Sequence, residues 1–312
     1  MGVFVFLPLI LPLTAWPVAR LAEQHLHPRT ATRLLTVLAV VLALCSTVCL
    51  ALVMVVGTAQ LPGNPLPDGW SDPEVRAAVP YDEVVGKAAI PALCAVVVAC
   101  ARTVRRHARV RRRAHQALAG LRATEVAVLP DTEPYAYALP GRGAVRGRVV
   151  VTTALLDRLR PAERRALFAH ERAHLAARHD RYLLAVQLAA RANPFLRPLR
   201  TAVAYTAERW ADEEAARTIG SRRTVARAIG TAALVSRSAP LPTLAGLAAP
   251  GPVPRRVAAL LGPAPAVPDW PPAFTAVGLA AWGAAAGTAI SAMSSANAAV
   301  TMFLILHAAT PL

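Results

Sequence analysis

Uncharged apolar stretches recur along the chain and set its organisation. Residues 2–18 and 34–56 hold no charged side chain, and residues 271–309 are again free of charge. A shorter apolar run at 88–101 reaches about 18 residues if the preceding valines and a snorkelling Lys87 are included. Because a membrane-spanning helix needs about 20 predominantly apolar residues, the pattern predicts about four transmembrane helices.

The first and last stretches each allow a second interpretation. The first resembles a cleaved signal peptide in length, but it has no basic residues before its apolar core and contains several prolines, so a retained helix is favoured. The last is longer than one span requires and is interrupted by serines and Asn297. We expect one long or bent helix there, with a tight hairpin as the alternative.

The central part of the chain has mixed periodicities typical of an α+β domain. A basic helix at 103–121 is followed by alternating apolar patterns separated by turn residues, which predict strands at 125–129, 135–139 and 147–152. Further helices are expected from Pro161, at 182–192, 204–217 and 224–236, and at 255–261 inside a Pro-rich linker covering 239–271. The predicted division is 1–102 for three spans, 103–270 for the central domain and 271–312 for the last span.

Charge gives the orientation. The chain has 34 Lys and Arg residues against 18 Asp and Glu, a net charge of +16 that comes almost wholly from arginine. The loop after the first span is basic, the loop 57–82 is acidic, and the run 102–113 is densely basic. Since basic loops stay on the cytosolic side, the amino terminus is expected outside and the central domain in the cytosol. Abundant alanine and a single lysine suggest a bacterial source.

A basic run also raises the possibility of nucleic-acid binding. The run 102–113 directly follows a membrane span, however, so topology and anionic lipid headgroups explain it more simply. The expected partners are therefore the lipid bilayer and a polypeptide, and no nucleic acid is expected. The cysteines all fall in predicted spans and are interpreted as small apolar helix residues.

The pentapeptide from His170 to His174 is the strongest chemical signal. Its sequence, His-Glu-Arg-Ala-His, is the H-E-x-x-H arrangement in which two imidazoles bind one zinc. Four residues of a helix advance about 400°, so both histidines project from one face, about 6 Å apart along the axis. Glu171 borders that face, from which its carboxylate can reach a water without occupying a ligand position.

A third protein ligand is required, since a catalytic zinc binds three side chains and keeps one position open. Glu208 is the candidate, with Asp212 one turn later as a hydrogen-bond acceptor that fixes a ligating imidazole. The alternative is that this acidic cluster is a solvated face, which is the expectation for Glu213 and Glu214. Residue 179 lies on the opposite side of a continuous helix from His170, so it is not expected in the site.

The two motifs together resemble the integral-membrane gluzincin metallopeptidases, which include HtpX-like and CAAX prenyl proteases and BlaR/MecR-type peptidases. The H-E-x-x-H pentapeptide followed by Glu208-Arg-Trp-Ala-Asp212 matches their H-E-x-x-H and E-x-x-A-D pair. The similarity extends over about residues 124–220, including Arg178-His179-Asp180. The segment 135–138 departs from the Asn-Ala-Phe-Ala of prenyl proteases, so the role of that asparagine does not transfer.

The resemblance implies a mainly α membrane protein with a cytosolic α+β zincin-like metallopeptidase domain. It implies one Zn²⁺ per chain, held by His170, His174 and Glu208, with Glu171 as general base and a polypeptide substrate. That substrate is either a membrane protein or a cytosolic repressor. A sheet edge near the zinc would bind it as an added strand. Tyr205 and Arg217 are open candidates for stabilising the oxyanion.

Two other classes of function compete with the endopeptidase. The first is a signalling or scaffold membrane protein with a structural or degenerate zinc site, in which Glu171→Gln would leave function intact. The second is a membrane-anchored nucleic-acid binder, whose binding would fall steeply with salt and with loss of the arginines at 105–113.

Overall fold

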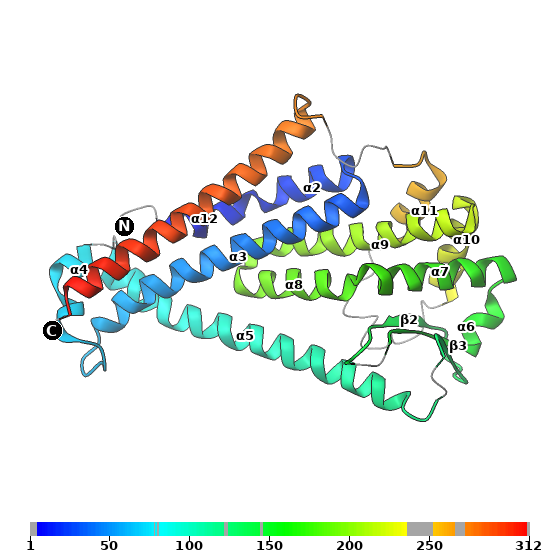
Figure 1. Ribbon diagram of the computed structural model, residues 1–312, viewed down its shortest axis with the longest axis horizontal. Coiled ribbons are helices and arrows are strands. Elements are labelled where there is room, and N and C mark those ends of the chain that lie inside the picture. Colours follow the sequence, from blue (N-terminus) through cyan, green and yellow to red (C-terminus); the bar gives the residue numbers. More distant parts are fainter. Residues whose placement is uncertain are drawn as a thin grey trace.

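Three helices of the computed structural model are long and apolar enough to cross a membrane: α3 (Pro28–Ala59), α5 (Asp82–Ala117) and α12 (Ala276–Ala308) (Figure 1). The predicted mainly helical membrane protein with a small sheet is confirmed. The last apolar stretch is a single helix and not a hairpin. The structure describes residues 5–77, 79, 81–121, 124–143, 146–235, 252–265 and 272–310.

The first predicted span differs from the expectation of one helix. It consists of three short pieces, α1 (Leu7–Ile10), η2 (Leu11–Thr14) and α2 (Ala15–His25). Each piece carries a proline within its first three residues, and proline fits a first turn but cannot donate the hydrogen bond that would continue the preceding helix. The described residues therefore hold three membrane-capable helices in place of about four. The segmented run lies alongside α3 and α12.

The helices α3 and α5 cross tightly at one end of the molecule. Gly57 of α3 faces Gly86 of α5, and a Cβ added to either would collide with the backbone of the other. This end also carries η3 (Asp68–Ser71) and α4 (Pro73–Ala77), with the Trp70 indole N–H donating to Thr310 Oγ1 at 3.0 Å. From the crossing, α3 and α5 diverge toward the end that carries the sheet (Figure 1).

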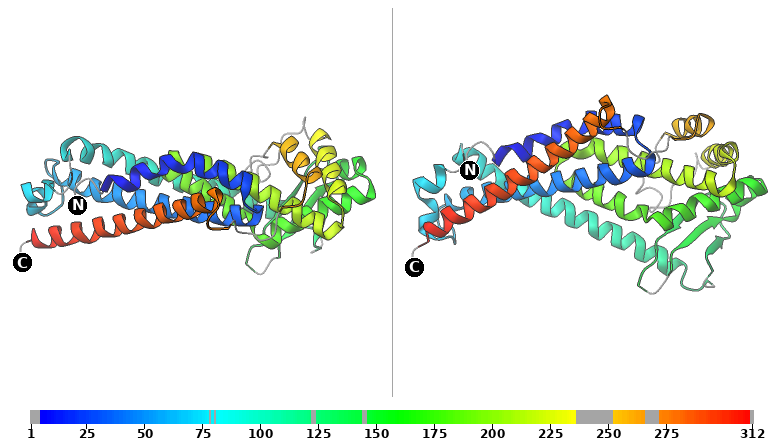
Figure 2. Two further views of the ribbon diagram at one scale, coloured as in Figure 1. Left: turned by 90° about the horizontal axis from the view of Figure 1, so that it is seen from above. Right: turned by 45° about the horizontal axis from the view of Figure 1, so that its top comes forward.

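A helical hairpin fills the space between the diverging helices. It comprises α8 (His179–Ala192), η4 (Pro194–Leu196) and α9 (Arg197–Ile219), and both views in Figure 2 place it beside α3. One apolar cluster joins Leu35, Leu38 and Leu42 of α3 to hairpin residues such as Leu196 and Leu199. The burial of this cluster anchors the hairpin on the membrane helix.

The sheet has three short strands, β1 (Val126–Leu129), β2 (Ala136–Leu139) and β3 (Arg148–Thr152), in the order β1-β3-β2. The strands predicted at 125–129, 135–139 and 147–152 are thus confirmed. β1 pairs with β3 in parallel and β2 with β3 antiparallel, which leaves β2 as an edge strand. The remaining helices are α6 (Thr153–Arg158), α7 (Pro161–Ala177), α10 (Arg222–Val235) and α11 (Val253–Leu261).

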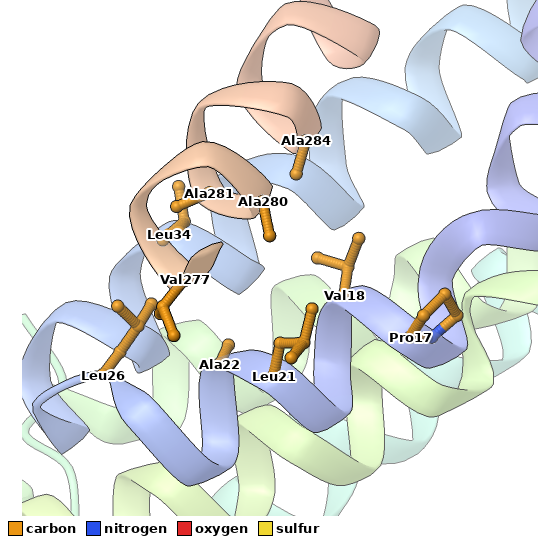
Figure 3. Close-up of a pocket in the computed structure, with 10 residues that line it drawn as sticks. All are labelled: Pro17, Val18, Leu21, Ala22, Leu26, Leu34, Val277, Ala280, Ala281 and Ala284. Carbon is orange, nitrogen blue, oxygen red and sulfur yellow. The ribbon is translucent and has the colours of Figure 1, made fainter. Parts of the chain in front are cut away.

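The basic helix predicted at 103–121 is the continuation of α5 and not a separate element. The helix expected within the Pro-rich linker is α11, whereas the linker segments 236–251 and 266–271 lie outside the described residues. A pocket opens between α2, α3 and α12, lined by apolar side chains that include Val18, Leu21, Leu34 and Val277 (Figure 3). The side chains that line it carry no polar group, so the functional site lies elsewhere.

We predict that Gly57→Val destabilises the protein by about 1–3 kcal/mol, because a side chain at this crossing forces the two backbones apart. Gly283→Val in α12 is the matched control, since a Cβ there meets nothing within 4 Å. The measurement is thermal unfolding of both variants in the same detergent. Equal unfolding temperatures would show that the glycine contact does not hold the bundle together.

Candidate metal centre

The helix α7 presents the pentapeptide at a fixed place in the fold. It begins at Pro161, as predicted, and the Glu163 carboxylate accepts a 2.9 Å hydrogen bond from the Arg160 backbone N–H. This contact satisfies a backbone donor at the helix start. Small side chains at 166, 169 and 173 are buried against neighbouring helices, which carries His170 and Glu171 into the interior.

Three donor groups converge between α7 and α9. The Nε2 atoms of His170 and His174 lie 3.1 Å apart, and each is 3.5 Å from a carboxylate oxygen of Glu208. All three ligand atoms lie within 4.8 Å of one another. A separation of 3.1 Å suits either a hydrogen bond or a shared cation, and two imidazoles with a carboxylate are a donor set that zinc prefers. The residues present therefore fit a metal ion.

Asp212 lies behind His170, one helical turn from Glu208. Its carboxylate is 3.0 Å from His170 Nδ1, so it holds the ring with Nδ1 protonated and Nε2 turned to the other donors. Burial alone would lower the pKa of His170, but hydrogen bonds to Asp212 and Glu208 outweigh it and raise that pKa to about 10. The pocket thus favours positive charge at this point.

His179 supports the second imidazole, contrary to the prediction that it points away. The helix does not continue through it: α7 ends at Ala177, and Arg178 adopts a left-handed conformation with φ 55°. This break turns His179 back, so that its Nδ1 lies 2.9 Å from Nδ1 of His174. His179 is almost fully buried beside Trp210, and burial lowers its pKa to about 2. A neutral ring there accepts the His174 Nδ1 proton and leaves Nε2 of His174 free to bind a metal.

Arg256 is the residue that sequence reasoning missed altogether. It comes from α11, is buried, and contacts both oxygens of Asp212 at 2.6 and 2.9 Å and Glu208 at 2.8 Å. Burial would raise the pKa of Glu208, but Arg256 and both imidazoles hold it well below its usual range. The only signal in the sequence was an arginine in a short helix within a Pro-rich segment, and nothing local connects it to Glu208.

Glu171 lies beside the three donors and not among them. It is buried, and burial raises its pKa to about 7. It also accepts a hydrogen bond from the backbone N–H of Ala138 in β2. The carboxylate is therefore fixed between the convergent donors and the edge of the sheet, with a pKa suited to proton transfer near neutrality.

The other residues considered from sequence lie outside this centre. Arg217 is exposed and pairs with Glu214, and Tyr205 packs under the guanidinium of Arg255 at 4.3 Å. Glu214 is partly solvated, as expected. Glu213, in contrast, is buried between Arg209 and Arg222, so the prediction that it belongs to a solvated acidic face is wrong. Asp180, from the matched Arg178-His179-Asp180 segment, approaches Arg111 of α5 at 3.7 Å.

The membrane helix α3 braces the ligand-bearing helix α9. Trp210 of α9 packs on His179, and the guanidinium groups of Arg29 and Arg33 lie 5.6 and 5.3 Å from its ring. Thr32 donates a buried 2.9 Å hydrogen bond to Thr206. Because these contacts flank Glu208 on α9, the start of α3 fixes the position of that carboxylate.

Comparison with known proteins defines the class. The model of peptidase family M48 matches residues 101–191, a segment that contains the sheet, α7 and nearly all of α8. This is a metalloprotease family whose members depend on a metal, typically zinc. The resemblance to the membrane metallopeptidases is confirmed over this segment, and it supports a peptide-bond hydrolase. No curated protein and no solved structure matches the chain.

We predict that Arg256→Met destabilises the protein by about 3–5 kcal/mol, since it leaves two buried carboxylates without their cation. The neighbouring Arg255→Met is the control, because Arg255 is half exposed, and its contacts with Glu23 and Tyr205 are expected to contribute less than a buried pair. Chemical unfolding in detergent gives both values. If the two variants lose the same stability, Arg256 does not carry this role.

Proposed function

We propose that the protein is a membrane-embedded, zinc-dependent endopeptidase, with one Zn²⁺ per chain held by His170, His174 and Glu208. The observation that carries the proposal is the convergence of the two Nε2 atoms and the Glu208 carboxylate around one point, which is a donor set that suits zinc. When bound, zinc polarises the scissile carbonyl and makes water a better nucleophile.

Glu171 acts as the general base in this proposal. Its carboxylate takes the proton of the attacking water and later delivers it to the leaving amine. Two features of the chain prepare it. The Ala138 N–H fixes its position, and burial brings its pKa to about 7, high enough to accept a proton in the reaction. Asp212 and His179 keep the proton on the outer nitrogen of each metal-facing imidazole.

The edge of β2 is the proposed binding strand for the substrate. In the antiparallel pairing with β3, Tyr137 faces Val150 and the Tyr135 carbonyl accepts from the Thr152 N–H. The alternation of a strand then turns the N–H and C=O groups of Ala136 outward. Ala138 lies two residues along the same edge, and its N–H reaches Glu171. An extended peptide added to this edge would pass beside the general base.

The polypeptide substrate and the sidedness follow from the charge pattern and the resemblance. The basic segments at the start of α3 and after residue 101 lie at the end of the bundle that carries the sheet. Because basic flanks stay in the cytosol, this end is the cytosolic one, in a bacterial cell membrane. The substrate is a membrane protein or a cytosolic repressor that reaches the site from this side.

We expect Glu171→Gln to reduce peptide hydrolysis by roughly 10²–10⁴-fold, because the variant cannot accept a proton. Zinc should stay bound, since Glu171 is not a ligand. Glu208→Ala should lose both activity and stoichiometric metal. Metal content by mass spectrometry and comparison of membrane proteomes from cells with each variant are the measurements. Full zinc content in Glu208→Ala would refute the ligand assignment.

The strand-addition mode predicts a defect in substrate binding for Ala136→Pro. Proline removes an outward N–H that the sheet does not use, and an edge strand tolerates it. Loss of one hydrogen bond should raise KM by about two- to tenfold with little change in kcat. Ala136→Val keeps the N–H and is the control. An unchanged KM in the proline variant would exclude this edge as the binding strand.

A further inference from the structure

We propose that the tip of the α8–α9 hairpin, residues 191–200, is a binding site for the phosphate headgroups of anionic phospholipids. The proposal deepens the proposed function, on whose orientation it rests, and it names a partner that the peptidase chemistry does not require. Its support comes from the depth of the tip, its charge, and its position beside α5.

The tip lies beside the apolar parts of the membrane helices. Cys100, halfway along α5, has its Sγ 3.8 Å from the Leu188 carbonyl, and the tip continues one to two turns past that point. The segment η4 also contacts η2, whose Leu11 approaches Gly287 in the interior of α12. The hairpin therefore does not rest on top of the membrane helices but enters between them (Figure 1).

The charge at the tip is uncompensated by protein. Arg191, Arg197 and Arg200 are all exposed, and within the described ranges none has an ion pair with a carboxylate. Phe195, between them, is 54% exposed. Charged side chains at membrane depth need a partner, so three cations around an exposed aromatic ring call for anions at this place.

The adjoining turns of α5 add to the same positive region. Arg102, Arg105 and Arg106 are exposed and begin two residues after Cys100, the residue that touches α8. Buried Thr103 and the partly buried His107 belong to the helix face turned to α8, whereas the three exposed arginines lie on the remaining helix surface, toward the surroundings. The arginines of α5 therefore lie on the side of Cys100 toward the sheet, and those of the tip lie on its other side, so that positive side chains flank this contact.

A phospholipid phosphate is the anion that can reach this level. Guanidinium groups bind phosphate in a bidentate manner, and arginine keeps its charge in apolar surroundings. The exposed Phe195 fits the acyl-chain boundary below the headgroup. Nucleic acids and acidic proteins stay in the aqueous phase, whereas an anionic lipid brings its own apolar chains.

The site would influence the metal centre through rigid elements. His179, which contacts His174, is the first residue of α8, and α9 carries Glu208. Both helices meet at the tip. A lipid that fixes the tip therefore fixes the position of Glu208 relative to the His179 ring that supports His174, without touching either.

The test uses the full-length protein in neutral detergent and measures its unfolding temperature during titration with short-chain phosphatidylglycerol or phosphatidylcholine with the same acyl chains. We expect the anionic lipid to raise the unfolding temperature and the zwitterionic lipid to have little effect. Combined replacement Arg191→Gln, Arg197→Gln and Arg200→Gln should require at least tenfold more phosphatidylglycerol for the same shift. The control replaces the exposed Arg158, Arg165 and Arg227 by Gln.

Several outcomes would overturn the proposal. These are an equal response of the triple variant and the wild type, an equal effect of both lipids, or an equal effect of glycerol phosphate or an acidic peptide at the same concentration. If the triple variant does not fold, Arg191→Gln and Arg200→Gln are measured singly, with Arg→Lys versions expected to retain the response. Because the shift is read without catalysis, failure here leaves the peptidase proposal standing, and an inactive protein would still show the lipid response.

Discussion

Two carboxylates buried beside two imidazoles are the constraint that organises this molecule. Glu208 and Asp212 lie one turn apart on α9, and removal of such charges from water is costly unless cations meet them. Arg256 supplies one cation from α11, and the space between the imidazoles accepts another. The imidazoles come from α7, the carboxylates from α9 and the guanidinium from α11. Contact between these three helices brings the opposite charges together.

The same centre is tied to the membrane helix at the start of the chain. The guanidinium groups of Arg29 and Arg33 pack on the Trp210 ring. Trp210 in turn packs on His179, and His179 contacts His174. None of Arg29, Arg33 and Trp210 lies in the segment 101–191 that matches the peptidase family. Contacts from outside the matched segment therefore complete the surroundings of His170 and His174. The geometry around the three donor groups therefore depends on the position of α3.

Local patterns in the sequence predicted the features that depend on local geometry. The i,i+4 spacing placed His170 and His174 on one face, the acidic pair one turn apart on α9 indicated Glu208 and Asp212, and alternation located the strands. What failed depended on single backbone conformations or on distant contacts. His179 was misplaced because a left-handed arginine, which helical periodicity does not reveal, interrupts the helix at 178. Arg256 was missed because its partners lie more than forty residues away. The first span was predicted as one helix from the length of its apolar run. That length does not show where prolines end one helical segment and begin the next.

The contact between Gly57 and Gly86 has a consequence far from where it lies. With no side chains between them, the backbones of α3 and α5 touch at these glycines. From this contact the two helices diverge toward the end that carries the sheet. Arg111 donates a hydrogen bond to the turn after β2. It lies 25 residues along α5 from Gly86, a distance of about 37 Å. A rotation of about five degrees at the glycines would move that turn by about 3 Å, as much as the separation of the two imidazole nitrogens. The angle between α3 and α5 at the two glycines therefore sets how far the turn after β2 lies from α3.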